Sequence, residues 1–212
     1  MTDAHGLMRD GLGISFGHDV ADDLELRICG DVRGKRVLEL GIFGSMPNCV
    51  TLARKGARVT SVDTQRDAIQ RARHSANEFE VNVEFHEGGH ADLGMMMSGT
   101  VDLAVSIHQI DMDTDVARLF RQVHRVLKPE AGFIFALGHP AAAIFDRGDP
   151  TARRQYGTTT PTIGELTMAL QRTNFTIDVM YELMPISQPR AVVPSTLIIR
   201  ARKLGASNYA LF

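Results

Sequence analysis

The stretch from Arg36 to Asp63 constrains the fold of this chain more than any other. It contains, in order, an apolar run from Arg36 to Leu40, a turn with Gly41 and Gly44, a short helical run, and a second apolar run that Asp63 closes. The apolar runs carry Val and Leu on both faces, as strands do in a parallel sheet that is covered on both sides. Two parallel strands need a crossover, which the helical run supplies. The stretch therefore predicts a strand, turn, helix and strand in succession.

The acid at the end of the second apolar run is placed to hold a sugar. Asp63 follows Gly41 by 22 residues, near the ~20 residues at which such a carboxylate accepts the hydroxyls of a ribose. We therefore interpret the stretch as half of a nucleoside-binding site.

The turn itself discriminates between nucleosides. A dinucleotide site needs G-x-G-x-x-G, because the backbone must approach a pyrophosphate closely. Here the second glycine is missing, and Phe43 or Met46 would crowd a pyrophosphate. Glu39, two residues before Gly41, would repel phosphate but suits a ligand with an ammonium group. S-adenosylmethionine has an ammonium group, a ribose and an adenine, and it carries no phosphate.

These residues resemble motif I of class I S-adenosylmethionine-dependent methyltransferases. That motif is an acid, one residue and G-x-G-x-G, with an acid ending the next strand. Phe43 and Ser45 stand at its second and third glycines, and the turn is one residue longer than usual. The resemblance runs from about residue 26 to residue 203 and is strongest to the small type 11 group. Residues 127–132, LKPEAG, resemble the family's L-K-P-G-G turn before the fifth strand.

The fold class expected from the resemblance and the apolar patterns is α/β. We expect a Rossmann-like, doubly wound, mostly parallel seven-stranded sheet with a C-terminal antiparallel β-hairpin and helices on both faces. Prolines 185, 189 and 194 leave no room for a helix between the last two strands, which favours the hairpin. One domain is expected over residues 1–212, with an N-terminal helical segment at 1–30 and a lid loop at 141–160. Helices are predicted at 22–28, 65–78, 116–127 and 162–173, and the later strands at 81–87, 101–107, 133–137, 175–183 and 195–203.

The resemblance also implies which residues meet the cofactor. In the family an acid after the third strand accepts from the adenine amino group, but Gly89 stands at that position here. The backbone of Gly89 and His90 can still read the adenine edge, or His90 can stack on it; a solvent-exposed loop histidine is the alternative. Phe16 either touches the cofactor or belongs to a partly ordered tail. The residues expected to bind S-adenosyl-L-methionine are Glu39, Gly41, Phe43, Gly44, Asp63, Thr64, Gly89, His90 and Ser106.

Two histidines are candidates for catalysis. Methyl transfer from a sulfonium is an in-line displacement that depends on alignment and desolvation. A general base helps when the acceptor is a hydroxyl or a protonated amine, and histidine titrates in the right range. His108 follows the fourth predicted strand and His139 the fifth, where ligands bind in open parallel sheets. For each, the alternative is a buried histidine that holds a loop by hydrogen bonds.

Composition limits the classes of binding partner and the cell compartment that we expect for this protein. A net charge of −2 argues against a nucleic-acid platform. Cys29 and Cys49 lie in separate apolar segments and are interpreted as reduced thiols of a cytoplasmic protein. The first ten residues hold no apolar signal region, and no run reaches the ~20 apolar residues of a membrane span. The spacing of His86, Glu87 and His90 matches no standard metal site. We expect no metal, nucleic-acid or membrane partner, and a homodimer is one option for the assembly.

The leading hypothesis is an enzyme that transfers a methyl group from S-adenosylmethionine to an O, N or C nucleophile of a small molecule. A second hypothesis is a protein of the same fold that binds a cofactor or ligand without catalysis, since the glycine turn is altered and Gly89 replaces an acid. An NAD-linked oxidoreductase is the third. Asp63 permits it, but the glycine turn and the predicted terminal hairpin argue against it.

Overall fold

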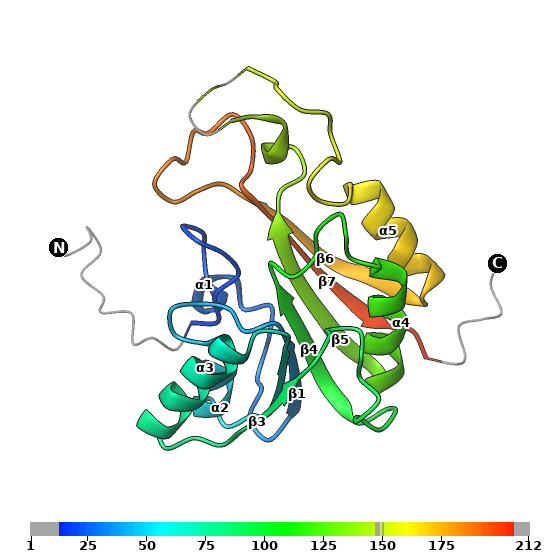
Figure 1. Cartoon of the computed structure of the whole chain (residues 1–212). Coiled ribbons are helices and arrows are strands. Elements are labelled where there is room, and N and C mark those ends of the chain that lie inside the picture. The colour runs from blue at the N-terminus through cyan, green and yellow to red at the C-terminus, as the bar shows by residue number, and fades with distance from the viewer. Residues whose placement is uncertain (1–12, 147–148, 150, 206–212) are drawn as a thin grey trace.

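A computed structural model describes residues 13–146, 149 and 151–205 (Figure 1). A sheet of seven strands runs through the middle, with helices on both of its faces. Its strands lie in the order β3-β2-β1-β4-β5-β7-β6. Their bounds are β1 Arg36–Leu40, β2 Arg58–Asp63, β3 Val83–Glu87, β4 Val101–Ile107, β5 Leu127–Gly138, β6 Phe175–Leu183 and β7 Thr196–Lys203.

The strand directions confirm the predicted mixed sheet. Strands β3, β2, β1, β4 and β5 pair in parallel, whereas β7 runs antiparallel to both β5 and β6. The terminal hairpin is therefore present, with β7 inserted between β5 and β6. Leu40 of β1 pairs with Val62 of β2 on one side and with Ser106 of β4 on the other. This register brings the carboxyl ends of three strands to one edge of the sheet.

The helices divide between the two faces because successive strand residues point to opposite sides. On one face, Val37, Val59 and Val105 pack with α2 and α3. On the other, Leu38 and Phe135 pack with α4 and α5. The helices are α1 Asp23–Leu26, α2 Asn48–Arg54, α3 Arg66–Glu78, α4 Val116–Val126 and α5 Ile163–Arg172. Among the described residues, no helix has both the length and the apolar character needed to span a membrane.

The segment LKPEAG differs from its prediction as a turn between α4 and a strand that starts at Phe133. Strand β5 already begins at Leu127, which pairs with Val101. The pairing register shifts between Val101 and Leu103, so that Leu103 faces Gly132. Glu130 takes a left-handed backbone with φ of 64° inside this irregularity. The segment is therefore a bulged start of β5, a position in which a sheet tolerates proline.

The described part of the predicted lid loop at 141–160, which leaves out residues 147, 148 and 150, contains little regular structure. After β5 a short 3-10 helix, η1 Ala142–Ile144, is followed by a single bridge between Phe145 and Ala152. Helix α5 then begins at a capping box, in which Thr162 and Glu165 satisfy each other's backbone amides. In Figure 1, η1 and the β6–β7 connection lie above the carboxyl ends of the parallel strands β4 and β5.

Within the N-terminal segment predicted at 1–30, residues 13–30 pack on the core rather than forming a loose tail, and residues 1–12 lie outside the described part of the chain. Ile14 and Phe16 are fully buried and pack on the α2 side of the sheet. Asn48 at the start of α2 holds the segment through two bonds of 2.8 Å, accepting from the Ser15 amide and donating to the Ser15 carbonyl. Asp19 continues the attachment, because its carbonyl accepts from the Ile186 amide at 2.7 Å. The segment thus joins α2 to the β6–β7 connection.

Candidate active site

The candidate site lies where the winding of the sheet reverses. The chain runs outward from β1 to β2 and β3, then returns to place β4 on the other side of β1. In open α/β sheets, ligands bind outside the carboxyl ends of the strands at this reversal. The residues that follow or end these strands are Gly41 after β1, Asp63 at the end of β2 and His108 after β4.

Two glycines shape the turn after β1. Gly41 has a φ of 78° and donates its amide to the Val62 carbonyl at 2.8 Å. Gly44 has a φ of 96°, and a Cβ placed there would lie 2.6 Å from the Met46 carbonyl oxygen. Both positions favour glycine, since other residues rarely adopt such backbone angles. The turn then enters α2, where the Asn48 amide donates to the Phe43 carbonyl at 3.0 Å.

Asp63 fastens this turn to the end of β2. Its Oδ2 accepts from the Ile42 amide at 2.7 Å, and its Oδ1 accepts from the Gln65 amide at 2.6 Å. The residue is only 5% exposed. A carboxylate has about four acceptor positions, so each oxygen keeps capacity for a further donor. Asp63 is therefore able to hold the turn and to accept hydroxyl groups at the same time. The next residue, Thr64, is exposed to solvent.

Glu39 is a buried carboxyl group directly beneath this turn. It is fully buried on β1, and its Oε2 accepts from the Ser61 hydroxyl at 2.8 Å. Its Oε1 has no hydrogen-bond partner. Burial raises the pKa of Glu39 to about 7, although Ser61, Cys49 and the backbone of Phe43 oppose the shift. A cation beside Glu39 would lower the pKa of this carboxyl group, because an adjacent positive charge favours the ionised form. Binding of the cation would then release the carboxyl proton to solvent.

Two more buried polar atoms near this edge lack partners. They are His90 Nε2, in the loop after β3, and Ser106 Oγ, next to the end of β4. Burial lowers the pKa of His90, and the nearby Asp63 carboxylate opposes that shift. The His90 ring is therefore neutral at pH 7 and able to exchange hydrogen bonds in either direction. Gly89, beside it, uses its carbonyl to accept from the Asp92 amide at 2.8 Å.

These unpartnered atoms are concentrated on residues that the sequence singles out. Native proteins satisfy nearly all buried polar groups, and an unsatisfied one costs about 1–3 kcal/mol. Five such side-chain atoms occur in the described part of the chain, and Glu39, His90 and Ser106 carry three of them. The other two are on His124 and Thr160. The carboxyl edge of the sheet is therefore the region best supplied with polar atoms that a ligand would satisfy.

His108 lies next to the glycine turn. Its ring stacks on Phe43, with centroids 5.2 Å apart and an interplanar angle of 29°. Phe43 also contacts His18 at 5.4 Å between centroids, and Gly17 packs close to the His108 Nε2 atom. His108 as a whole is exposed, although its ring lies against Phe43. Partial burial lowers the pKa of His108, while the Phe16 backbone opposes the shift.

His139 has a different environment after β5. It is 4% exposed, and its Nε2 pairs with Glu182 Oε1 of β6 at 2.7 Å. Its Nδ1 accepts from the Ala141 amide at 3.1 Å, which assigns the ring proton to Nε2. Both ring nitrogens therefore hold neighbouring chain segments, and β4 lies between β5, which His139 follows, and β1, which the glycine turn follows.

Two contributors to the site have no signal in the sequence. Asn48 follows Pro47 at the start of α2 and holds the Ser15 backbone, yet nothing in the sequence links these positions. Gln109 follows the fourth predicted strand, at the edge where ligands are expected, but no pattern links its side chain to Gly41, against which it lies. Both placements depend on contacts between segments that are distant in the chain, so a local pattern cannot reveal them.

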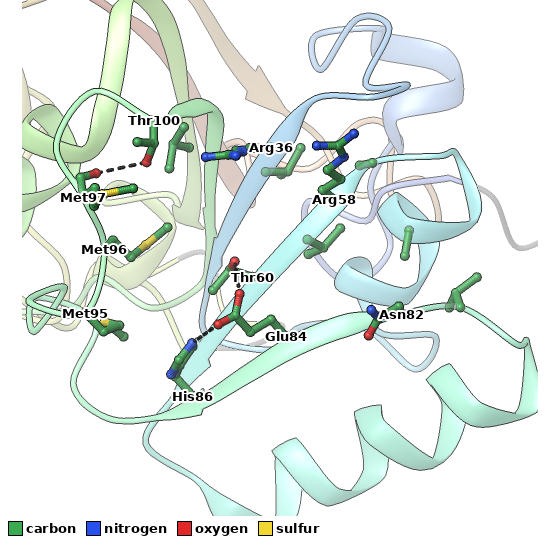
Figure 2. Close-up of a pocket in the computed structure, with 16 residues that line it drawn as sticks. Arg36, Arg58, Thr60, Asn82, Glu84, His86, Met95, Met96, Met97 and Thr100 are labelled. Atoms are coloured by element: carbon green, nitrogen blue, oxygen red, sulfur yellow. Dashed lines mark hydrogen bonds and ion pairs between the residues drawn. The ribbon is translucent and has the colours of Figure 1, made fainter.

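A large groove lies on another part of the molecule. It has a volume of about 720 Å³ and lies on the face of β1, β2 and β3 (Figure 2). Arg36 and Arg58 border it at the starts of their strands, and Met95, Met96 and Met97 line its opposite side. None of the predicted cofactor residues lines it. We therefore place the candidate site at the carboxyl edge and not in this groove.

The His86, Glu87 and His90 set is not arranged for a metal. His86 Nε2 pairs with Glu84 at 2.9 Å, and Glu87 pairs with Arg66 at 3.1 Å. Within the described ranges, no three His, Cys, Asp or Glu side chains are grouped as metal ligands.

Comparison with known sequences relates the first part of the chain to methyltransferases. Residues 37–130 match a family model described as "Methyltransferase domain". The chain is 29% identical over 115 residues to a ubiquinone biosynthesis O-methyltransferase of Xanthomonas oryzae pv. oryzae, covering 54% of this chain and 48% of the relative. A protein of the same name from Alkalilimnicola ehrlichii is 28% identical over 114 residues, covering 54% and 46%. The chain thus spans about half the length of these relatives.

Comparison with solved structures covers more of the chain. An S-adenosylmethionine dependent methyltransferase from Mesorhizobium loti superposes with a TM-score of 0.69 at 26% identity, covering 85% of this chain and 96% of the other. Geranyl diphosphate C-methyltransferase from Streptomyces coelicolor, crystallised with S-adenosyl-L-homocysteine, gives 0.67 at 15% identity, covering 86% and 78%. The second likeness concerns the fold alone.

Proposed function

We propose, from the premise that residues 37–130 form a domain of the class I S-adenosylmethionine-dependent methyltransferase family, that this protein methylates a small molecule. The observation that carries the proposal is the set of unpartnered buried atoms on Glu39, His90 and Ser106 at the carboxyl edge of the sheet. These atoms suit a ligand that has a cationic group at one end and a hydrogen-bonding nucleobase at the other. S-adenosylmethionine has both, and its sulfonium supplies an activated methyl group that leaves on a neutral sulfide.

In this proposal the residues divide the cofactor between them. Asp63 accepts the ribose hydroxyls with the lone pairs that the Ile42 and Gln65 amides leave free. Glu39 faces the ammonium group from beneath Gly41, and the missing side chain at Gly41 lets the amino-acid tail approach the backbone. The neutral ring of His90 lies at the adenine end, where the Asp63 carboxylate is close.

We propose His108 as the group that takes a proton from the acceptor. Its lowered pKa keeps the ring neutral near pH 7, as a general base requires. Its position after β4 lies beside the glycine turn, where the methyl group would be presented. For His139 we propose a structural role, since hydrogen bonds to Glu182 and Ala141 engage both of its ring nitrogens.

Oxygen is the acceptor atom that we favour, because the relatives from Xanthomonas and Alkalilimnicola are named O-methyltransferases. A panel of phenols, carboxylic acids and amines, incubated with the protein and S-adenosylmethionine, tests this directly. We expect S-adenosylhomocysteine to accumulate with a hydroxyl-bearing acceptor. Tight cofactor binding with no turnover on any acceptor class would instead support a protein that binds without catalysis.

We also propose that residues 1–212 act as one domain in the cytoplasm. Support for the compartment comes from Cys29 and Cys49, which are both free and buried. Support for the single domain comes from the sheet, whose seven strands extend from residue 36 to residue 203.

A further inference from the structure

Gln109 lies across Gly41 at the proposed cofactor site. A Cβ added to Gly41 would fall 2.1 Å from the Cδ atom of Gln109 and 2.2 Å from its Cγ, so the carboxamide rests directly on the glycine. The Nε2 atom of Gln109 donates to the Ile107 carbonyl at 3.1 Å. The side chain therefore bridges the ends of β1 and β4, over the crevice in which ligands bind in this kind of sheet.

The backbone on each side of Gln109 fixes this placement. His108 takes a left-handed conformation with φ of 54°, which residues other than glycine seldom adopt. Its amide donates to the Ala136 carbonyl at 2.7 Å. Ile110 on the other side is 3% exposed and packs into the core with α4. Local strain of this kind is characteristic of functional segments.

The chemistry of the Gln109 carboxamide resembles that of the ligand tail. It offers N–H donors and a carbonyl oxygen, as the end of an amino acid offers an ammonium and a carboxylate. Its N–H group uses the Ile107 carbonyl at 3.1 Å. The cofactor tail that we place over Gly41 therefore competes with Gln109 for space.

We propose that Gln109 gates the amino-acid subsite of the cofactor. Its side chain must leave Gly41 before the tail of S-adenosylmethionine enters, and the adenosyl part of the ligand is unaffected. This inference rests on the proposed function, because it names how access to that same site is regulated.

The gate is weakly held. Among the described residues, the side-chain carboxamide of Gln109 makes a single hydrogen bond, and the residue is only half-buried. A closed conformation of this kind lowers the affinity for the ligand without abolishing binding. A gate that is closed for about nine-tenths of the time weakens the apparent affinity about tenfold.

The test compares two ligands on two variants. S-adenosylhomocysteine carries the amino-acid tail, whereas 5′-methylthioadenosine lacks it. Gln109→Ala removes the gate, and Gln171→Ala is the matched control, because Gln171 is an exposed residue of α5. We expect Gln109→Ala to bind S-adenosylhomocysteine about three- to tenfold more tightly than the wild type and to bind 5′-methylthioadenosine with unchanged affinity. The control should match the wild type with both ligands.

Three other results would be informative in different ways. Weaker binding of S-adenosylhomocysteine by Gln109→Ala would overturn the gate, because it would make Gln109 a direct ligand contact. Equal tightening for both ligands would also overturn it, because the obstruction would then lie over the adenosyl part. A wild-type protein that binds neither ligand would contradict the proposed function itself. Thermal melting of both variants serves as the control that they are folded.

Discussion

The backbone amide of Ile42 donates to Oδ2 of Asp63 at 2.7 Å, so the end of β2 holds the turn that follows β1. One carboxylate thereby organises the glycine turn and, in our proposal, grips the ribose. The two tasks are compatible because a carboxylate accepts several hydrogen bonds at once.

Asp63→Ala should lose affinity for S-adenosylhomocysteine. Two charge-assisted bonds to the ribose disappear, and we expect a loss of about 2–4 kcal/mol, given ~1.5–3 kcal/mol per bond without full additivity. The variant should also melt at a lower temperature, because the amides of Ile42 and Gln65 lose their acceptor. Calorimetric titration checks the first effect and thermal melting the second. Glu78→Ala, at an exposed acid of α3, is the control and should change neither. A folded Asp63→Ala with unchanged affinity would remove Asp63 from the site.

Glu39 should make the stability of the ligand-free protein depend on pH. Burial raises the pKa of Glu39 to about 7 from an ordinary value of 4.5, so the folded state holds this proton more tightly than the unfolded chain. The resulting contribution of Glu39 to the free energy of unfolding is fully present below pH 4.5 and is lost as the pH rises through about 7. The loss is on the order of 3 kcal/mol. Urea unfolding of wild type and Glu39→Gln should show free energies that diverge over this window, in favour of the variant at high pH. Parallel curves would contradict the shift.

Cofactor binding should release a proton from Glu39. The ammonium group of the ligand favours the ionised carboxylate, whereas burial raises the pKa of Glu39 to about 7 in the ligand-free protein. Affinity for S-adenosylhomocysteine should therefore rise as the pH increases from about 6 to 8. Calorimetry in buffers of different ionisation enthalpy measures the released proton. Glu39→Gln should bind more weakly and release no proton from this site, and an unchanged proton count in that variant would refute the assignment.

His108 and His139 should respond differently to substitution. His108→Ala should lower turnover by about 10²–10⁴-fold if a hydroxyl is the acceptor, while cofactor affinity changes little. The wild-type rate should rise with pH, with a midpoint below the ordinary value for histidine, because burial lowers the pKa of His108. His139→Ala should instead lower the melting temperature, since the Glu182 and Ala141 contacts are lost. Reversed results, with His139→Ala inactive but stable, would exchange the two roles.

The sheet was predictable because its signals are local. Alternating and continuous apolar runs mark each strand, and Pro185, Pro189 and Pro194 exclude a helix before the last one. The start of β5 was not predictable, since Pro129 and the following residues resemble a turn, whereas pairing with β4 extends the strand through a bulge. The placement of Gln109 on Gly41 was equally hidden. It depends on the left-handed backbone of His108, a conformation for which a histidine gives no reliable sign.

The central claim is that the carboxyl ends of β1, β2 and β4 bind the adenosyl cofactor through Asp63. Calorimetric titration of the wild-type protein with S-adenosylhomocysteine, repeated on Asp63→Ala, tests it most directly. We predict a saturable one-to-one isotherm for the wild type and a dissociation constant higher by at least about thirtyfold for the variant. No heat and no thermal shift at millimolar ligand, with the wild-type protein folded, would contradict the claim.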